Sequence, residues 1–258
     1  PDNLPAPLVD LSPNIEEYED TASNAGENWY IVSAYILGYE VFSEPFISGL
    51  TTVLTHDIFN DGSILATYNF DGNAIDLGGG TSLDSTGFTY TNNSIQGQAI
   101  ICGSASGARA FTGLDGFVTN SNGFSVSIWL YTDISIDNGY ILVSATGTNN
   151  QDTPIRIMND KVEMRGSQTS TGSVTIPKSK WFHVVTTFDG TTGNNAIYIN
   201  NTLDTAFTNG QSFSVNQPLH FRSFITGGYS YTGLIDQLRL FNRPLTQEEV
   251  DILYQEGG

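Results

Sequence analysis

Short apolar runs separated by glycine- and asparagine-containing turns recur along the chain from residue 63 onward. The turns fall at sequences such as Asp71-Gly72-Asn73, Ser121-Asn122-Gly123 and Asp189-Gly190. Short strands at this spacing are typical of an antiparallel β-sandwich. The predicted strands are Ser63–Phe70, Gln98–Cys102, Phe124–Tyr131, Tyr140–Ser144, Pro154–Met158, Val162–Arg165, Trp181–Phe188, Ala196–Asn200 and Leu234–Phe241.

A single helix is predicted, at the C-terminal end of the chain. Thr246 and Glu249 have the spacing of a capping box, in which each side chain binds the backbone N–H of the other residue. Val250, Leu253 and Tyr254 then follow at helical spacing and form an apolar stripe. The stripe indicates that this helix packs against the sandwich.

Residues 1–60 differ from the rest of the chain and are predicted to form a separate arm before a domain at 61–258. The arm begins with a proline-rich stretch, continues through an acidic stretch at 15–20, and reaches an aromatic and β-branched run at 29–42. That run favours a strand or hairpin with Gly38 as a bulge or turn. Two interpretations stay open: the run pairs with the main sheet, or it anchors the protein to another subunit of a homo-oligomer or to other structural proteins of an assembly.

The charge of the chain limits its partners. Nine Lys and Arg residues stand against 27 Asp and Glu residues, which gives a net charge of −18. Residues 1–108 contain fourteen acidic residues and no basic one. Binding to nucleic acid needs Lys or Arg at the phosphates, so nucleic acid is excluded as a partner. A single cysteine, Cys102, excludes an intramolecular disulfide, and no apolar run is long enough to insert into a membrane.

Four blocks of sequence carry a resemblance to a known family. They are Tyr68–Asp76, Phe124–Leu130, Trp181–Gly190 and Gly233–Thr246. In this order they resemble the laminin-G-like domains of the concanavalin A-like lectin/glucanase superfamily, over residues 63–256. The resemblance implies an all-β jelly roll of two curved antiparallel sheets. The approach to the first strand, Asp57–Ser63, is similar to versions of this domain in structural proteins of tailed bacteriophages.

Asp236 is the first candidate for a metal ligand. Strict alternation along Leu234–Leu240 predicts that its side chain shares a face with leucines. A carboxylate in such a row is costly unless it is paired or binds a cation. The chain is poor in Lys and Arg, so a metal ion is a natural partner.

Asp71 and Asp76 lie in the turn after the first strand and complete the predicted metal site. Carboxylate oxygens are the ligands that Ca²⁺ prefers. The resemblance implies that the first and last strands are neighbours and that calcium binds there in several members. The sequence therefore predicts a calcium site at Asp71, Asp76 and Asp236. The alternative is that these aspartates cap turns by accepting hydrogen bonds from backbone N–H groups.

Three loops rich in amides, hydroxyls and tyrosines are candidates for carbohydrate recognition, at 147–152, 166–172 and 226–232. Such groups bind sugar hydroxyls, and an aromatic ring can pack on the C–H side of a sugar. The candidate residues are Asn149, Asn150, Gln168, Tyr229 and Tyr231. The alternative for each loop is an ordinary solvated turn. Trp129 and Trp181 lie within apolar strands and are expected in the core.

No pattern indicates catalysis. The glucanases of the resembled superfamily carry Glu-x-Asp-x-x-Glu on one strand, and that motif is absent. Glu163 is the only glutamate between Glu44 and Glu248. His183, alone in a strand, is expected to be a structural hydrogen-bonding residue.

The sequence therefore favours a non-catalytic structural or adhesion protein on a virion or cell surface, outside the cell. The arm would anchor it, and the lectin-like sandwich would decorate that surface or bind a polysaccharide. The alternative is a carbohydrate-binding module of a secreted polysaccharide-degrading enzyme.

Overall fold

The computed structural model describes residues 56–103, 108–119, 121–144, 152–214, 217–222 and 229–257, together with four short strands between residues 29 and 47. The chain forms two compact units, Pro1–Val53 and Leu54–Gly258. Residues 56–60, which the sequence assigns to the arm, therefore belong to the second unit.

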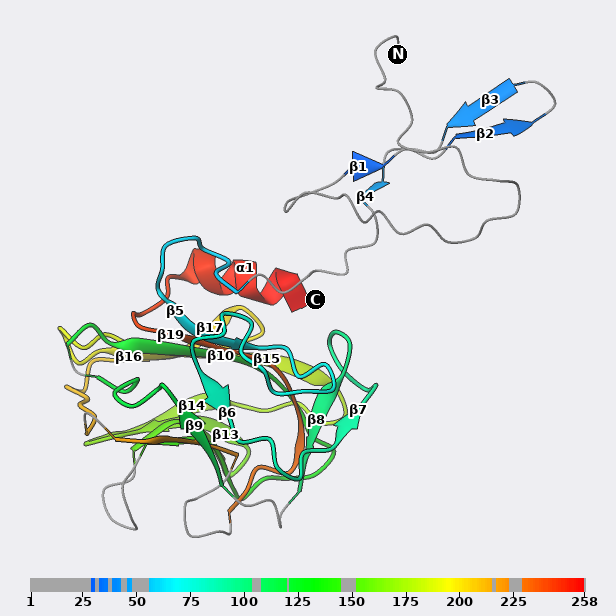
Figure 1. The fold of residues 1–258 in the computed structure, drawn as a ribbon. Helices are drawn as coiled ribbons and strands as arrows, with labels where there is room; N and C mark the ends of the chain where they lie inside the picture. The colour runs from blue at the N-terminus through cyan, green and yellow to red at the C-terminus, as the bar shows by residue number, and fades with distance from the viewer. Residues whose placement is uncertain are drawn as a thin grey trace. The chain divides into compact units, whose positions relative to one another are not determined.

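The first unit contains two small pairs of strands (Figure 1). Strands β2 (Ser33–Ile36) and β3 (Tyr39–Phe42) pair antiparallel, with Ile36 opposite Tyr39. Strands β1 (Trp29–Tyr30) and β4 (Phe46–Ile47) form the second antiparallel pair. The hairpin predicted within residues 29–42 is therefore present.

The second unit is a sandwich of two antiparallel sheets, as the sequence predicts (Figure 1). One sheet has the order β17-β16-β15-β10-β19-β8-β7, with β5 also paired to β19. Its strands are β5 (Ile64–Tyr68), β7 (Tyr90–Thr91), β8 (Ala99–Cys102), β10 (Phe124–Tyr131), β15 (Trp181–Phe188), β16 (Asn195–Ile199), β17 (Thr202–Phe207) and β19 (Gly233–Phe241). We call it the helix-side sheet, because the C-terminal helix covers it.

The second sheet has the order β14-β13-β12-β11-β18-β9-β6 and is called here the open-side sheet. Its strands are β6 (Ser82–Leu83), β9 (Arg109–Thr112), β11 (Asn138–Ser144), β12 (Asp152–Met158), β13 (Lys161–Arg165), β14 (Thr169–Thr175) and β18 (Leu219–Phe221). All nine predicted strands correspond to observed ones. The sequence misses β14 and β17, which lie at sheet edges and expose most of their side chains, and the short strands β6, β7, β9 and β18.

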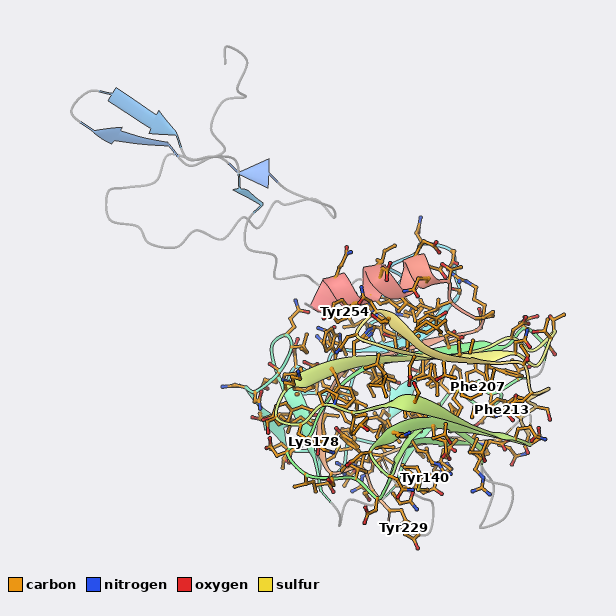
Figure 2. All side chains as sticks on the ribbon, turned by 180° about the vertical axis from the view of Figure 1, so that it is seen from behind. Tyr140, Lys178, Phe207, Phe213, Tyr229 and Tyr254 are labelled. Atoms are coloured by element: carbon orange, nitrogen blue, oxygen red, sulfur yellow. The ribbon has the colours of Figure 1, made fainter. Side chains whose placement is uncertain are left out.

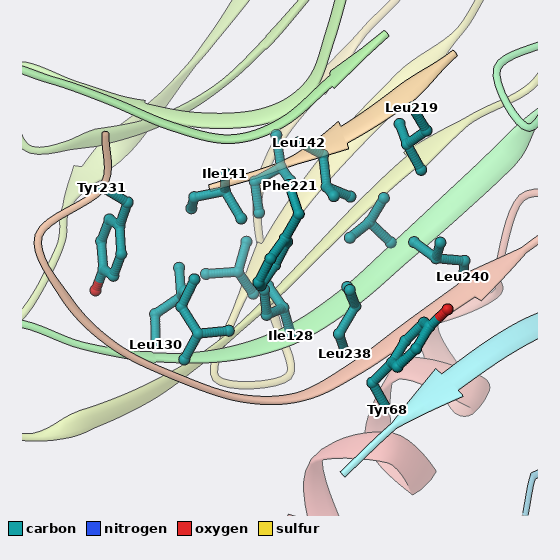
Figure 3. Packing of buried hydrophobic residues seen from close by; sticks show 14 of the residues in the cluster. Tyr68, Ile128, Leu130, Ile141, Leu142, Leu219, Phe221, Tyr231, Leu238 and Leu240 are labelled. Atoms are coloured by element: carbon teal, nitrogen blue, oxygen red, sulfur yellow. The ribbon is translucent and has the colours of Figure 1, made fainter. Parts of the chain in front are cut away.

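The core lies between the two sheets (Figure 3). Ile128 and Leu130 enter it from the helix-side sheet, and Ile141 and Phe221 enter it from the open-side sheet. These side chains are fully buried. The long strand β10 is buried along almost its whole length, because its outer face is covered as well.

Helix α1 (Gln247–Gly257) provides that outer cover (Figure 1). Val250 and Leu253 join Val185 and Phe241 in a second apolar cluster. The predicted capping box is present: Thr246 N–H donates to Glu249 Oε2 at 2.9 Å, and Glu249 N–H donates to Thr246 Oγ1 at 3.3 Å. Within the described part of the chain, no helix has the length and apolar character needed to cross a membrane.

A β-bulge in β19 corrects the predicted orientation of Asp236. The pairing with β10 shifts register between Ser127 and Trp129, and Gln237 has a left-handed backbone with φ of 46°. An extra residue in one strand reverses the alternation of side chains beyond it. Leu238 and the neighbouring Leu240 therefore belong to the core, whereas Asp236 pairs with Trp129, whose ring packs against helix α1. Asp236 does not share a face with the core leucines.

Candidate functional site

A polar cleft opens at one end of the sandwich, near Phe213 (Figure 2). Its volume is about 310 Å³. The lining residues come from the start of β12, the end of β13 and two loops, and they are Asp152, Arg165, Gly166, Ser167, Ser212, Phe213 and Ser214. Asp152 and the Gly166–Ser167 pair belong to two of the three loops that the sequence proposes for recognition.

Hydrogen bonds join the two loops that form this cleft. Ser167 N–H donates to the Ser212 carbonyl oxygen at 2.8 Å, and Ser212 N–H donates to Ser167 Oγ at 3.0 Å. Gln211 adds two more bonds, to the N–H of Gln168 at 2.7 Å and to its carbonyl oxygen at 3.0 Å. A side chain on Gly166 would collide with the Ser212 carbonyl oxygen. These bonds hold the two loops of the cleft against each other.

Asp152 and Arg165 give the cleft its chemistry. Asp152 accepts a hydrogen bond from the Ser214 N–H, and burial raises the pKa of its carboxyl group. Arg165 is exposed, and its positive charge partly offsets the rise in the pKa of Asp152. Phe213 packs on Phe124 and Phe188, with ring centroids 5.0 and 4.9 Å apart. Phe213 is therefore buried in the core and forms the floor of the cleft. A carboxylate, a guanidinium and serine hydroxyls at the cleft suit the hydroxyl groups of a sugar.

The five candidate recognition residues do not gather at one point. Gln168 is exposed in the turn that borders the cleft. Tyr229 is 60% exposed and lies beside Tyr140 on the outer side of the open-side sheet (Figure 2). Asn149 and Asn150 lie outside the described residues.

Tyr231 is not available to a ligand, which corrects its assignment as a recognition residue. Its side chain is fully buried in the core, and its hydroxyl donates to the Tyr131 carbonyl oxygen at 2.9 Å (Figure 3). The predicted loop 166–172 is also shorter than expected, because residues from Thr169 onward form β14. Strand β14 consists mainly of serine and threonine, so it lacks the apolar residues from which a strand is predicted.

Asp76 caps a turn, which is the alternative that the sequence left open for it. Its two carboxylate oxygens accept five hydrogen bonds of 3.0–3.1 Å. The donors are the N–H groups of Thr67, Gly78, Gly80 and Thr81 and the hydroxyl of Thr81. His56 Nδ1 lies 3.7 Å from the same carboxylate. These bonds support the turn-capping role of Asp76, and a calcium ion at this residue stays a prediction.

Asp71 and Asp236 converge on one loop, between β7 and β8. Gln98 N–H donates to Asp71 Oδ1 at 2.7 Å, and Ile95 N–H donates to Asp236 Oδ2 at 2.8 Å. Asp236 is fully buried, and burial raises its pKa to about 7, with the negative charge of Asp71 adding to that shift. The other oxygens of the pair also accept hydrogen bonds, from Gln237 N–H to Asp236 Oδ1 at 2.8 Å and from Asn69 Nδ2 to Asp71 Oδ2 at 2.7 Å. A cation beside both carboxylates would offset the cost of burying Asp236, and calcium at this pair stays a prediction.

Groups of three or more metal-ligating side chains are absent from the described part of the chain. A calcium ion held by Asp71 and Asp236 would therefore also need oxygen ligands that do not come from a third Asp or Glu side chain. Backbone carbonyl oxygens are common calcium ligands.

His183 and Ser127 form the one buried hydroxyl–imidazole contact found between described residues, with His183 Nε2 and Ser127 Oγ 2.8 Å apart. His183 is almost fully buried, and its ring packs against Trp129 and against Tyr254 of helix α1. Burial lowers its pKa to about 3, and the charge of Arg239 adds to the shift. The imidazole is therefore structural, as the sequence suggests.

Sequence reasoning missed Arg165, Phe213 and Ser214 as residues of the cleft. Arg165 looks like an ordinary strand cation, and residues 211–214 contain neither a motif nor an apolar pattern. Their meeting with Asp152 depends on the register of β12 and β13, where Thr153 lies opposite Arg165.

One family model matches the sequence, and it covers residues 103–251. It describes the concanavalin A-like lectin/glucanases superfamily. No curated protein matches the chain.

Several solved structures share the fold. Domain 4 of AbnA, a GH43 extracellular arabinanase from Geobacillus stearothermophilus solved in complex with arabinotriose, is 22% identical with a TM-score of 0.59. The similarity covers 75% of this chain and 98% of that domain. The binding domain of Paraclostridial Mosquitocidal Protein 1 is 16% identical, with a TM-score of 0.58 over 74% of this chain and 52% of that one.

A structure of botulinum neurotoxin type C, whose cell entry depends on interaction with two ganglioside molecules, is also similar. It is 16% identical, with a TM-score of 0.56, and the match covers 76% of this chain and 51% of that one. The present chain thus spans about half the length of the toxin structures. These similarities establish a lectin-like sandwich fold.

Proposed function

The chain belongs to the concanavalin A-like lectin/glucanase superfamily, and on that premise we propose that it is a non-catalytic carbohydrate-binding protein that works outside the cell. The observation that carries this proposal is the polar cleft lined by Asp152, Arg165 and the hydroxyl groups of Ser167, Ser212 and Ser214. The binding roles of the similar domains, with arabinotriose and gangliosides, support the same class of ligand.

In its finer form, the proposal is that the protein is displayed on a virion or cell surface. Residues 1–60 would anchor it to other structural proteins and give a homo-oligomer, while the sandwich would act in adhesion. Deleting residues 1–53 tests this part, because the remaining unit is compact by itself. We expect the deletion to turn an oligomer into a monomer, as measured by light scattering. The monomer should still bind carbohydrate. An oligomer that survives the deletion would contradict the anchoring role.

The second candidate is a carbohydrate-binding module of a polysaccharide-degrading enzyme. The match to almost the whole of domain 4 of the arabinanase favours it. In that case the full chain would already be monomeric in light scattering, and carbohydrate binding would not depend on residues 1–53.

We also propose that Asp71 and Asp236 hold a calcium ion. The convergence of two carboxylates on one loop, one of them fully buried, supports this site. The ion would fix the loop between β7 and β8 to the last strand. Because it would join the turn after β5 to β19, its role would be structural.

The test of carbohydrate binding uses a glycan array that includes linear arabino-oligosaccharides, with the whole chain in solution. We expect binding to at least one linear glycan and its loss in Arg165→Gln, because Arg165 lines the cleft and is exposed. Lys161→Gln is the matched control, since it removes one positive charge at the other end of the same strand. A wild-type chain without binding, or equal binding by both variants, would contradict the proposal.

A further inference from the structure

Tyr229 presents its ring to solvent in an unusual way. Among the large hydrophobic residues that are strongly exposed in the described part of the chain, it is the one aromatic residue. Its backbone is left-handed, with φ of 57°, a conformation that tyrosine rarely adopts. Strained backbone of this kind persists where the surrounding structure holds it, and it is common at ligand-binding sites.

Contacts with β11 hold the residue in place. Tyr140 N–H donates to the Tyr229 carbonyl oxygen at 2.8 Å, and Ser230 forms a β-bridge with Tyr140. The rings of Tyr140 and Tyr229 lie with centroids 6.4 Å apart. Figure 2 shows both tyrosines on the outer side of the open-side sheet.

A buried polar network fixes Tyr140 in turn. Arg156 Nη1 donates to the Tyr140 hydroxyl at 2.9 Å, and the guanidinium lies 5.3 Å from the centre of the Tyr140 ring. Arg156 Nε donates to Glu163 Oε1 at 2.7 Å, and the Thr171 hydroxyl donates to Glu163 Oε2 at 3.0 Å. A satisfied network of this kind makes the support under the tyrosines rigid.

The position of Tyr140 relative to the cleft follows from the strand pairing. Tyr140 pairs with Arg156, and Arg156 pairs with Glu163. Arg165 lies two residues further along the strand of Glu163 and therefore on the same face. Two strand spacings and two residues along a strand separate Tyr140 from Arg165, or roughly 12 Å at the usual sheet dimensions. A ligand that reaches both Tyr229 and the cleft must therefore be longer than a single sugar.

Charge along this path favours a neutral ligand. Arg156 and Glu163 neutralise each other, and the cleft end carries one charge of each sign, on Arg165 and Asp152. The chain as a whole carries a net charge of −18, which repels polyanions.

From these observations we infer that Tyr229 is a second subsite for a linear neutral polysaccharide that is also held in the Asp152–Arg165 cleft. Tyr140, Arg156 and Glu163 are buried, so the polysaccharide would contact the protein at these two places and not along the strands between them. This inference rests on the proposed carbohydrate-binding function. The ring of Tyr229 would pack on the C–H face of a sugar, while the cleft would hold the hydroxyls of another unit of the same chain.

The test compares disaccharides with hexasaccharides of arabinose, xylose, glucose and mannose as probes, using isothermal titration calorimetry on the full chain. We expect at least one hexasaccharide to bind about tenfold more tightly than its disaccharide, equivalent to about 1.4 kcal/mol. Tyr229→Ala should remove that difference and leave disaccharide binding unchanged, whereas Tyr229→Phe should retain it. Arg165→Gln should weaken both lengths.

The two proposals fail in different ways. Equal affinity for both lengths in the wild type, or an unchanged hexasaccharide affinity in Tyr229→Ala, overturns the second subsite and leaves the cleft intact. A Tyr229→Ala variant that loses both lengths equally also overturns it, because Tyr229 would then belong to the cleft. Failure of the wild type to bind any probe overturns both proposals.

Discussion

Asp71 and Asp236, which lie 165 residues apart in the sequence, hold the same loop through its backbone. Asp71 accepts a hydrogen bond from the N–H of Gln98. Asp236 accepts hydrogen bonds from the N–H groups of Ile95 and Gln96, at 2.8 and 3.2 Å. The first of these carboxylates follows β5, and the second lies in β19, which pairs with β5. The first and last strands of the sandwich are thus both tied to the loop between β7 and β8, each through one carboxyl group.

Calcium is expected to stabilise the fold through this pair. Binding to the native state alone raises stability as the ion concentration exceeds its dissociation constant, by about 2.7 kcal/mol at a hundredfold excess. The midpoint of thermal unfolding should therefore rise in calcium and fall in chelator. Asp236→Asn should remove this response, because the amide lacks the negative charge.

Asp115→Asn provides the control, since Asp115 is exposed on a different loop. That variant should keep the full calcium response. A wild-type midpoint that is the same in calcium and in chelator would contradict the metal site.

Acid should destabilise the protein partly through His183. Its pKa is lowered from 6.5 to about 3 in the fold by burial, so the unfolded chain binds a proton that the native state refuses. Stability from this residue is complete above pH 6.5 and declines as the pH falls toward 3, by at most about 1.4 kcal/mol per pH unit. Urea unfolding of wild type and His183→Gln across that window measures the effect.

The difference between the two proteins isolates the histidine from the carboxylates, which titrate in both. Glutamine can keep the hydrogen bond to Ser127 and does not bind a proton. We expect the variant to lose less stability than the wild type on acidification. Parallel curves would mean that His183 binds protons equally in the native and unfolded states, so that the fold does not lower its pKa.

Much of the fold could be predicted because its signals are local. Strands such as Phe124–Tyr131 and Trp181–Phe188 have the bounds that the apolar pattern indicates. The capping box at Thr246 likewise marks the start of α1. The orientation of Asp236 could not be predicted, because the bulge at Gln237 comes from pairing with β10 and leaves no mark in the sequence of β19.

The candidate site was only partly predictable for the same reason. Polar loops indicated Asp152, Ser167 and Tyr229 as lying in regions of recognition. The burial of Tyr231 could not be predicted, because Tyr229 is the same residue type two positions away and is exposed. Which loop meets which depends on strand order, and the role of residues 211–214 in the cleft arises only from that order.

The packing of helix α1 is expected to contribute strongly to stability. Leu253 is 2% exposed and lies in the outer apolar cluster, whereas its neighbour Ile252 is 44% exposed. Leu253→Ala should cost about 2–5 kcal/mol, because it leaves a cavity against the helix-side sheet. Ile252→Ala, the matched control in the same turn, should change stability by less than about 0.5 kcal/mol. Chemical denaturation measures both, and equal losses would contradict the observed orientation of the helix.

The buried pair of Arg156 and Glu163 should behave as one unit. Both side chains are less than one-tenth exposed, on the outer side of a sheet, and they also bind Tyr140 and Thr171. Arg156→Met or Glu163→Leu alone should cost about 3–5 kcal/mol, because each leaves the other charge buried without its partner. The double variant should cost clearly less than the sum, since apolar residues can replace a buried pair. A double-mutant cycle by urea unfolding measures the coupling, and additive losses would show that the two charges are solvated independently.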